Sequence, residues 1–550
     1  MNRSFWTISL VILCLLGGST ALASAPGGPG EPASPCADAP NDVRTIARRI
    51  ASERTQLRSP VRNWYVAQDR PLIWRSPSSD ASRAFRETLR KAEAEGLGGV
   101  DLQHDAILRD LDRLDLNAHS DSVVAEAEIA LSSAFLRLAE VLLRGSDARD
   151  EQDVEWAMQR DSAPGLEVLA IAADRGPQVA LDSVRPLLPL YDRTIRALAS
   201  LRARLESGGE WPTIEQETVA SLGDSMDVVA EVRSRLTESL VAEERELANG
   251  GAETPRLLDE RLAGAISRFQ LRHGLAVDSV IGPETITAMN VPLGDRIDQL
   301  RLNLDRIRWL PRDMGARAIL VNIAGFELRV LENNAPVMDM GVVVGQPSWR
   351  TAVFGDTIEH LIVNPYWHVP ESIEASETLP RVLENPAYLA ANDISVVPSD
   401  NNFGEPVDPS SIDWSSVSAE TMPYDFRQEP GPENALGQIK FMFPNQNNIY
   451  LHDTPADELF KQNFRAFSHG CIRVERPWDL AEYILRHNSD RRPGELAEIR
   501  ASRERTRLEL SDPLPVYIAY LTTWVHEDGT VSFHQDLYNR DQTEIAEASR

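Results

Sequence analysis

The sequence predicts a multidomain α+β protein in which helical domains precede a mainly β domain. Three observations support this fold class. The chain has 550 residues, more than one hydrophobic core usually organises, so we expect two to four domains. Apolar residues recur with helical periodicity through the first half of the chain, and the pattern changes to β strands after Pro311. A long segment rich in Pro, Asn and Ser then interrupts the β pattern.

The N-terminus has the features of a secretory signal peptide over residues 1–23. A short positive start precedes an apolar run over residues 5–16, and small residues end at Ala23. We expect export and cleavage near Ala23, because the apolar run is too short for a stable membrane span. An uncleaved N-terminal anchor is the alternative. Residues 24–40 are rich in Pro, Gly and Ala, which predicts a flexible linker.

Charge and cysteine content narrow the function. The chain carries 56 Lys and Arg against 84 Asp and Glu, a net charge of −28, which argues against nucleic acid and anionic membrane as partners. An acidic substrate would therefore need local basic groups for binding. Removal of the signal leaves only Cys36 and Cys471. Exported proteins usually pair or lose their cysteines, so Cys471 is bonded to Cys36, buried and inert, or functional.

Residues 41–250 are expected to form a helical domain. The helix predicted over residues 120–144 is apolar but contains Arg137 and Glu140, which favours a buried core helix over a membrane span. Other apolar periodicities predict helices over residues 80–95, 190–205 and 226–246.

Residues 251–295 are expected to form a small helical unit. A helix over 257–273 ends at Gly274, and proline at 283 suits the start of a second helix, because it loses no hydrogen bond there. Residues 278–285 resemble a segment of the small three-helix peptidoglycan-binding domain. The usual sequence of that domain at this place is Asp-Gly-x-x-Gly-x-x-Thr. Ser279 stands where that pattern has its first glycine. An ordinary helical hairpin is the alternative.

A mainly β domain is expected over residues 312–490. Strands are predicted over residues 318–323, 326–331, 337–344, 358–364 and 438–442, with a turn at Asn333-Asn334. Residues 365–437 interrupt this pattern, and an insertion of that length is usually functional, often a lid. After residue 490 we expect a charged helix over 495–510 and a β-hairpin around Asp528-Gly529, both packing on the β domain.

Two short segments carry the candidate chemistry. Residues 449–452 read Ile-Tyr-Leu-His, an alternation that predicts a strand with Tyr450 and His452 on one face. Residues 468–473 read Ser-His-Gly-Cys-Ile-Arg. An imidazole can take the proton of the Cys471 thiol and leave a strong nucleophile. Gly470 lets a carbonyl substrate approach the backbone, where N–H groups could hold an oxyanion.

Three other roles compete for these residues. Zinc ligation by Cys471, His452 and His469 lacks a fourth Cys or His at ligand spacing. A purely structural core fits poorly with Gly470 and Arg473 flanking a cysteine. A domain that only binds cell wall is the third, and the intact Cys–His pair argues against it.

The spacing resembles that of the L,D-transpeptidase (YkuD-type) catalytic domain. That family has His, fourteen to seventeen residues, then Ser/Thr-His-Gly-Cys, an apolar residue and Asn or Arg; here fifteen residues separate His452 from Ser468, and Arg473 fills the last place. Four further segments are similar in sequence to the long-chain, YcbB-like branch of the family: residues 364–367, 430–437, 440–445 and 451–455. Thr351-Ala352 departs from the Thr-Pro that such domains often carry.

This resemblance implies an architecture and a reaction. In that branch a helical scaffold and a peptidoglycan-binding domain precede a catalytic domain whose sheet is interrupted by a capping subdomain, here residues 365–437. The enzyme would be periplasmic, need no cofactor or metal, and act on peptidoglycan stem peptides. Cys471 would attack the bond between the third residue, a diaminopimelate, and the D-alanine at position four, forming an acyl-thioester. The amine of a diaminopimelate on a second stem would resolve it into a 3→3 cross-link.

The resemblance also implies residue roles. His452 would serve as base and then as acid, with a backbone carbonyl near Asp453 orienting the imidazole. The remaining candidates would bind substrate or support the nucleophile loop: Tyr450, Ser468, His469, Gly470 and Arg473. Carbapenem-type β-lactams are expected to acylate Cys471. Other cell-wall synthesis enzymes are possible partners, and the alternatives are an L,D-carboxypeptidase, a lipoprotein-attaching transpeptidase and a non-catalytic peptidoglycan-binding scaffold.

Overall fold

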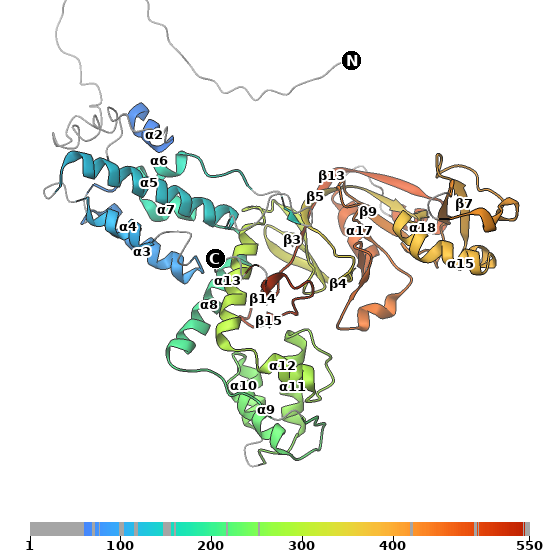
Figure 1. Cartoon of the computed structure of the whole chain (residues 1–550), viewed down its shortest axis with the longest axis horizontal. Coiled ribbons are helices and arrows are strands. Elements are labelled where there is room, and N and C mark those ends of the chain that lie inside the picture. Colours follow the sequence, from blue (N-terminus) through green and yellow to red (C-terminus); the bar gives the residue numbers. More distant parts are fainter. Residues whose placement is uncertain are drawn as a thin grey trace, which may run out of the picture.

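The computed structural model describes residues 60–544, apart from gaps at 69–71, 76–77, 98–103, 115–118, 147–155, 159–160, 216–217, 251–253, 419–421, 489–491, 493 and 543. The predicted signal peptide, the linker and Cys36 lie outside the described residues. Helices gather in the first half of the chain and strands in the second, which confirms the predicted α+β class. Three arms meet near α13 (Leu293–Arg308): a helical arm, a small helical unit and the β domain (Figure 1).

The helical arm packs around α5 (Asp121–Arg144), whose buried face includes Leu131, Phe135 and Leu138. This helix is a core element, as its sequence predicted. The other helices of the arm are α2 (Pro60–Gln68), α3 (Asp80–Ala94), α4 (His104–Asp112), α6 (Glu167–Arg175), α7 (Pro177–Asp182) and α8 (Pro189–Glu206). The helix α13, which was not among the predicted helices, packs on α8. It buries Arg308, whose guanidinium donates to the Glu95 carbonyl at 2.8 Å.

The small helical unit contains α9 (Asp227–Thr237), α10 (Ala242–Asn249), α11 (Glu260–Arg272) and α12 (Pro283–Met289). The predicted single helix over 226–246 is wrong, because residues 238–241 separate α9 from α10. The Ser239 hydroxyl donates to the buried Glu244 carboxylate at 2.5 Å across that break. Ser279 adopts φ +61°, a left-handed conformation that glycine favours. The amide of Ser279 donates to the Gln270 side chain at 3.0 Å, which holds the turn without glycine.

The β domain is a closed ring of strands. Its strands are β2 (Arg317–Asn322), β3 (Glu327–Glu332), β4 (Ala335–Gly345), β5 (Val353–Val363), β9 (Ile439–Met442), β10 (Leu451–His452), β12 (Ile472–Val474) and β13 (Thr506–Ala519). They pair in the order β5-β13-β2-β3-β4-β12-β10-β9, and β9 pairs with β5 to close the ring. β11 (Ala466–Ser468) pairs with β4, and β1 (Trp156–Ala157) adds to β5 from the helical arm. The predicted turn at Asn333-Asn334 is confirmed, with φ of +50° and +64°.

The segment after residue 490 belongs to the ring, which corrects the expectation that it packs on a domain ending there. Strand β13 lies between β5 and β2. Helix α18 (Glu495–Ser502) ends before residue 506, so the helix predicted over 495–510 is wrong in its last part. Residues 506–510 read Thr-Arg-Leu-Glu-Leu, and their period of two suits a strand. The hairpin turn at Asp528-Gly529 is confirmed between β14 (Thr523–Val525) and β15 (Val531–Phe533).

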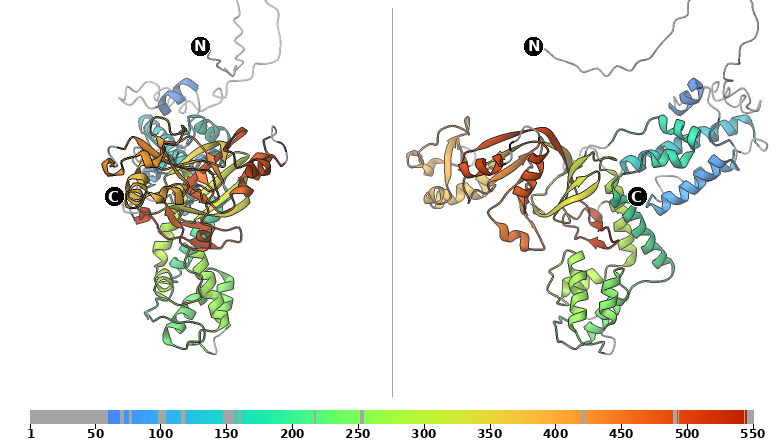
Figure 2. Two further views of the ribbon diagram at one scale, coloured as in Figure 1. Left: turned by 90° about the vertical axis from the view of Figure 1, so that its right-hand side faces the viewer. Right: turned by 180° about the vertical axis from the view of Figure 1, so that it is seen from behind.

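The insertion over 365–437 is an ordered unit with its own core. Strands β6 (Trp367–His368), β8 (Tyr424–Gln428) and β7 (Ile394–Pro398) form a separate sheet. The α14 helix (Glu371–Ile373), the π-helical turn η1 (Glu374–Thr378), α15 (Leu379–Glu384) and α16 (Ala387–Ala391) cover it. Val382, Val396 and Phe426 are fully buried in this core. The views from the side and from behind place the insertion at the end of the molecule opposite the helical arm (Figure 2).

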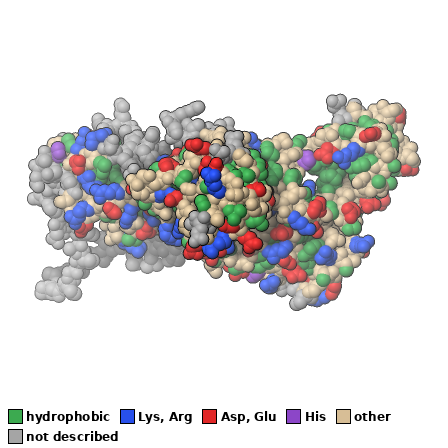
Figure 3. Space-filling view, turned by 90° about the horizontal axis from the view of Figure 1, so that it is seen from below, with side chains coloured by type: hydrophobic (Ala, Val, Ile, Leu, Met, Phe, Trp, Pro, Cys, Tyr) green, Lys and Arg blue, Asp and Glu red, His purple; other side chains and the backbone are tan. Residues whose placement is uncertain are grey.

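Surface character agrees with the composition. On the face seen from below, acidic and basic side chains are interspersed (Figure 3). Among the helices in the described ranges, none combines the length and the apolar character that crossing a membrane requires.

Candidate active site

Strand register places the candidate catalytic side chains on one face of the ring. His452 on β10 is the partner of Lys440 on β9 and of Arg473 on β12. Leu451, the strand neighbour of His452, is fully buried in the core of the ring. His452, Lys440 and Arg473 therefore point to the opposite face, because successive side chains on a strand alternate. Continuing the alternation places two further side chains, Tyr450 and Cys471, on the face of His452. The amide of Ile472 donates to the Tyr450 carbonyl at 3.1 Å, which shows that the pairing extends this far.

The loop that carries Cys471 is held by its own neighbours. The Ser468 hydroxyl donates to the Cys471 carbonyl at 2.5 Å and accepts from the Gly470 amide at 3.1 Å. Gly470 has φ +107°, a conformation that a residue with a Cβ rarely adopts. The Thr351 hydroxyl donates to the Gly470 carbonyl at 2.8 Å. Ser468 and Gly470 therefore shape the loop. Thr351 also stabilises it, although from the sequence Thr351-Ala352 was noted only as a departure from the family motif.

The C-terminal segment braces this support from below the loop. The Tyr538 hydroxyl donates to the Gly345 carbonyl at 2.6 Å and accepts from the Thr351 amide at 3.1 Å. The Thr351 hydroxyl also accepts from the Gly345 amide at 2.9 Å. Residues almost two hundred positions apart thus hold the nucleophile loop, and local sequence patterns could not reveal that link.

His452 is buried and oriented by the backbone. Its Nδ1 lies 2.6 Å from the Asp453 carbonyl oxygen, which accepts a hydrogen bond from the protonated nitrogen. Nε2 is then the unprotonated nitrogen and can accept a proton. Burial, followed by the positive charge of Arg473, lowers the pKa of His452 to about 3. The imidazole is therefore neutral at neutral pH, as a general base must be.

Cys471 is a free, partly exposed cysteine in the described part of the chain. Its Sγ lies 3.6 Å from the Asn448 carbonyl oxygen. Burial raises the pKa of the thiol, while hydrogen bonding by Tyr450 and the charges of Lys440 and Arg473 lower it in part. Thiol and imidazole are thus both neutral at rest. Proton transfer from Cys471 has to accompany attack on the substrate.

Tyr450 and Lys440 complete the polar surroundings of the sulfur. Burial and the neighbouring Cys471 raise the pKa of the Tyr450 hydroxyl well above its usual value, so the phenol remains a hydrogen-bond donor. The Lys440 Nζ lies 5.1 Å from the centre of the Tyr450 ring, and burial lowers its pKa to about 8. Lys440 was not among the candidates from the sequence. The alternation of Lys440, Phe441 and Met442 on a strand was the signal that could have found it.

His469 does not join the face of His452. Its ring lies 5.2 Å from that of Trp349, and its Nε2 lies 3.3 Å from a carboxylate oxygen of Glu377 in the π-helical turn of the insertion. Arg473 is half-buried, its Nε has no hydrogen-bond partner, and burial lowers its pKa. Within the described residues, no group of three or more His, Cys, Asp or Glu could hold a metal ion.

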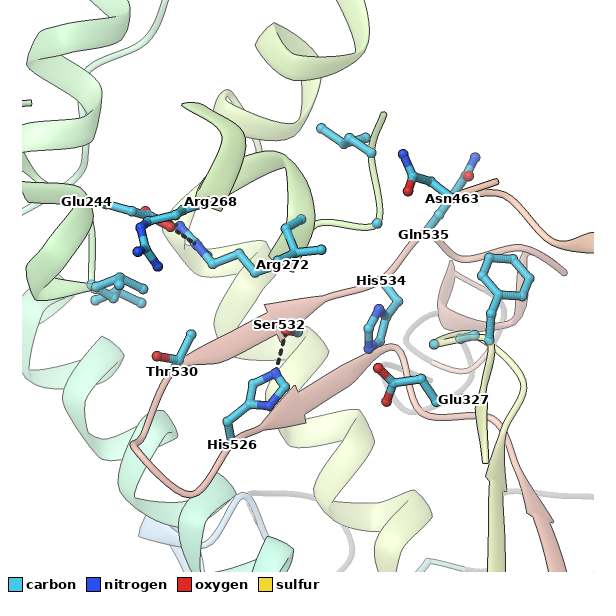
Figure 4. Close-up of a pocket in the computed structure, with 18 of the residues that line it drawn as sticks. Glu244, Arg268, Arg272, Glu327, Asn463, His526, Thr530, Ser532, His534 and Gln535 are labelled. Atoms are coloured by element: carbon cyan, nitrogen blue, oxygen red, sulfur yellow. Dashed lines mark hydrogen bonds and ion pairs between the residues drawn. The ribbon is translucent and has the colours of Figure 1, made fainter. Parts of the chain in front are cut away.

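A cavity of about 750 Å³ lies away from Cys471, where α11 faces the β14–β15 hairpin. The Arg272 guanidinium points to the Glu244 carboxylate with N–O distances of 2.7 and 3.1 Å, and the His526 Nε2 lies 2.8 Å from the Ser532 hydroxyl (Figure 4). Its wall also includes Phe326 and Phe464. Arg268 and Arg272 here are paired with Glu243 and Glu244, whereas Lys440 near Cys471 has no salt bridge within the described residues.

Comparison with known proteins identifies two parts of the chain. The family model of the L,D-transpeptidase catalytic domain, YkuD, matches residues 316–517, and that of a Scaffold domain matches residues 59–198. A putative L,D-transpeptidase of Haemophilus influenzae is 34% identical over 252 residues, which are 45% of this chain and 49% of the relative. The chain thus spans about half the length of the curated relative it matches.

Three solved structures are similar to parts of the chain. An L,D-transpeptidase from Mycobacterium smegmatis is 13% identical, with 37% of this chain and 58% of that chain covered at a TM-score of 0.16. One from Xylanimonas cellulosilytica is 11% identical, with 55% and 98% covered at 0.18. L,D-transpeptidase 3 from Mycobacterium tuberculosis, solved with a faropenem-derived adduct, is 15% identical, with 37% and 60% covered at 0.16.

The matched catalytic model includes both His452 and Cys471, and it ends at residue 517 within β13, in agreement with the closed ring. It begins at residue 316, next to the first strand of that ring. The second model covers the helical arm up to residue 198, within α8. Residues 316–517, which carry His452 and Cys471, therefore match the YkuD-type L,D-transpeptidase catalytic domain, and they follow a match to a Scaffold domain over residues 59–198.

Proposed function

We propose that this protein is a periplasmic L,D-transpeptidase that forms 3→3 cross-links between peptidoglycan stem peptides through an acyl-thioester on Cys471. The observation that carries the proposal is the placement of Cys471 and His452 on one face, with the His452 imidazole neutral and anchored by its Nδ1. The N-terminal signal features support export, and the small helical unit is proposed to contact the cell wall. Association with other cell-wall synthesis enzymes is part of the proposal and can be tested by cross-linking.

The first half of the reaction is acylation. The Cys471 sulfur attacks the carbonyl carbon of the third stem residue while His452 Nε2 takes the thiol proton. The tetrahedral intermediate then collapses, the bond to the D-alanine nitrogen breaks, and His452 returns the proton to the leaving amine. The Tyr450 hydroxyl is positioned beside the sulfur and can donate to developing negative charge there.

The second half transfers the acyl group. The side-chain amine of a second stem attacks the thioester carbonyl, and His452 takes one amine proton. The sulfur leaves and recovers that proton from His452, so the enzyme returns to its starting state. No external energy source is required, because the thioester stores the energy of the peptide bond that was broken.

The test uses the purified mature protein with disaccharide-tetrapeptides and mass analysis of the products. We expect D-alanine release, a Cys471-linked acyl-enzyme and a 3→3 dimer. Cys471→Ala should yield none of these, and Cys36→Ser, which removes the other mature cysteine, should yield all three. A disaccharide-tripeptide as the only product would identify a carboxypeptidase. Binding without product would leave a cell-wall-binding scaffold.

A further inference from the structure

The face that carries Cys471 continues into cationic and aromatic side chains at the base of the insertion. We call them the basic cluster, and its members are Tyr366, His368, Phe403, Arg427, Lys440 and Arg505. Four of them belong to the insertion, Lys440 lies on β9, and Arg505 directly precedes β13. The cluster therefore joins the insertion to the catalytic ring.

Ring and guanidinium contacts hold the cluster together. The rings of His368 and Phe403 lie 4.7 Å apart, and the Arg505 guanidinium lies 5.2 Å from the Phe403 ring. The Arg427 guanidinium lies 4.5 Å from the Tyr366 ring. The charge of Lys440 acts on both His368 and the Cys471 sulfur, which makes this lysine the link between the cluster and the nucleophile.

Two of the cations in the cluster have no acidic partner. Arg427 pairs with Glu429 at 2.8 Å, but Lys440 and Arg505 form no salt bridge to any residue in the described ranges. Both ring nitrogens of His368 are buried without a hydrogen-bond partner. Burial and the neighbouring cations lower the pKa of His368 to about 4 and that of Lys440 to about 8. Lys440 is partly buried, and such a cation is costly to keep without a counter-charge unless an anion joins it.

A purely structural role does not account for the cluster. Structural cation–π contacts gain most where they are buried. Here Phe403 is 59% exposed and Arg505 is exposed, so the outer half of the cluster is open to solvent beside the nucleophile. Open, unpaired cations next to aromatic rings suit a ligand with carboxylates and an aliphatic chain.

We propose that the basic cluster binds the free carboxylates of the donor stem, and that it selects stems with ionised carboxylates over stems in which those groups are amidated. The inference rests on the proposed function, because Cys471 fixes where the scissile bond lies. Lys440 and Arg505 supply the charge, and Phe403 covers the aliphatic part of the third residue. Amidation removes the negative charge of the carboxylate but keeps the size of the group. A difference in affinity between the free and the amidated stem therefore reports charge pairing.

The experiment measures binding by the full-length Cys471→Ala variant, which cannot turn over its ligand. Two disaccharide-tetrapeptides serve as probes, one with free carboxylates and one amidated on the glutamate and on the side chain of the third residue. We expect the free form to bind at least about tenfold more tightly, ~1.4 kcal/mol, with the preference shrinking as salt rises. Arg505→Gln in the same background should weaken only the free form, and Lys440→Gln serves as a second variant should the first fail to fold.

Arg492→Gln is the matched control, because Arg492 is an exposed arginine that contacts the acidic residues Glu495 and Glu498 of α18 and no member of the cluster. It should leave both affinities unchanged. Equal affinity for the two stems, or equal weakening of both by Arg505→Gln, would overturn the inference. Turnover by the parent enzyme tests the proposed function separately: selective binding without any turnover would refute the function and keep the cluster, whereas turnover without selectivity would do the reverse.

Discussion

Charged side chains concentrate in two regions of this protein, and the two regions differ in whether those side chains form salt bridges. At the cavity between α11 and the β14–β15 hairpin, Arg272 is paired with the fully buried Glu244, and Arg268 with Glu243. On the face of Cys471, Lys440 and Arg473 form no salt bridge within the described residues. Buried pairs of the first kind hold elements together, whereas unpaired charge of the second kind costs stability and is available to a substrate. Substitutions in the two regions should therefore change different properties.

The largest effect is expected at the nucleophile and its base. Cys471→Ala should abolish acylation by a carbapenem, and His452→Ala should slow it by about 10²–10⁴-fold at neutral pH, because proton transfer loses its acceptor. Both variants should melt at temperatures close to that of the parent. Intact-protein mass spectrometry over time measures the rate, and thermal melting measures stability. A His452→Ala variant that acylates like the parent would remove His452 from the mechanism.

The pH dependence of the same reaction sharpens this prediction. The pKa of His452 lies at about 3 and that of the thiol is raised, so neither group changes charge near neutrality. The parent rate should therefore be nearly flat between about pH 5 and pH 8, because the base stays unprotonated throughout. The His452→Ala rate should instead rise about tenfold per pH unit as the thiol ionises unaided. A parent rate that climbs steeply around pH 6.5 would show an imidazole with an ordinary pKa.

In the paired region, stability should change and chemistry should not. Glu244→Gln leaves the buried Arg272 without its counter-charge and should lower the free energy of unfolding by about 3–5 kcal/mol. Glu243→Gln makes the same chemical change in an exposed pair and should cost less than about 1 kcal/mol. Urea unfolding of the two variants gives the comparison. A similar cost for both would mean that burial does not set the strength of these pairs.

Lys440→Met should have the opposite profile. We expect kcat/KM for the tetrapeptide to fall about tenfold, ~1.4 kcal/mol, while the melting temperature at pH 7 stays equal or rises. The folded pKa of about 8 lies below the ordinary value of about 10.4, so the unfolded chain holds the proton more tightly and the charge opposes folding at neutral pH. That penalty should fade as the pH rises toward 10.4. A marked loss of stability at pH 7 would place Lys440 with the structural charges.

The smallest effect is expected at the contact between His469 and the insertion. Glu377→Gln should raise KM about two- to fivefold with little change in kcat, because a partly exposed pair contributes about 0–1 kcal/mol. Glu371→Gln, an exposed neighbour on the same insertion, should leave KM unchanged. The difference between the two variants should shrink in high salt. An unchanged KM in Glu377→Gln would show that this contact does not position the insertion.

Helix and strand prediction succeeded where the pattern was long and regular. The helix over 120–144 and the strands of the first β meander match the structure closely, because burial of one face imposes a period that the residues display. Prediction failed at residues 506–510, where arginine and glutamate on the exposed face of a strand imitate a charged helix. It also failed over 226–246, where Ser239 breaks an otherwise periodic stretch through its bond to Glu244.

The family motif and the candidate nucleophile can be recognised from the sequence alone, because the spacing between His452 and Ser-His-Gly-Cys is a local feature. The alternation around Tyr450 also predicts that Tyr450 and His452 share a face. Only the tertiary structure shows that Lys440 joins the site, through the pairing of β9 with β10. It also places Thr351 and Tyr538 beneath the nucleophile loop, and Glu377 beside His469. The physical reason is that these groups meet only when the ring closes and the insertion folds over it. Sequence periodicity reports which face a residue occupies, whereas the neighbours that shift a pKa or hold a loop are set by contacts between distant segments.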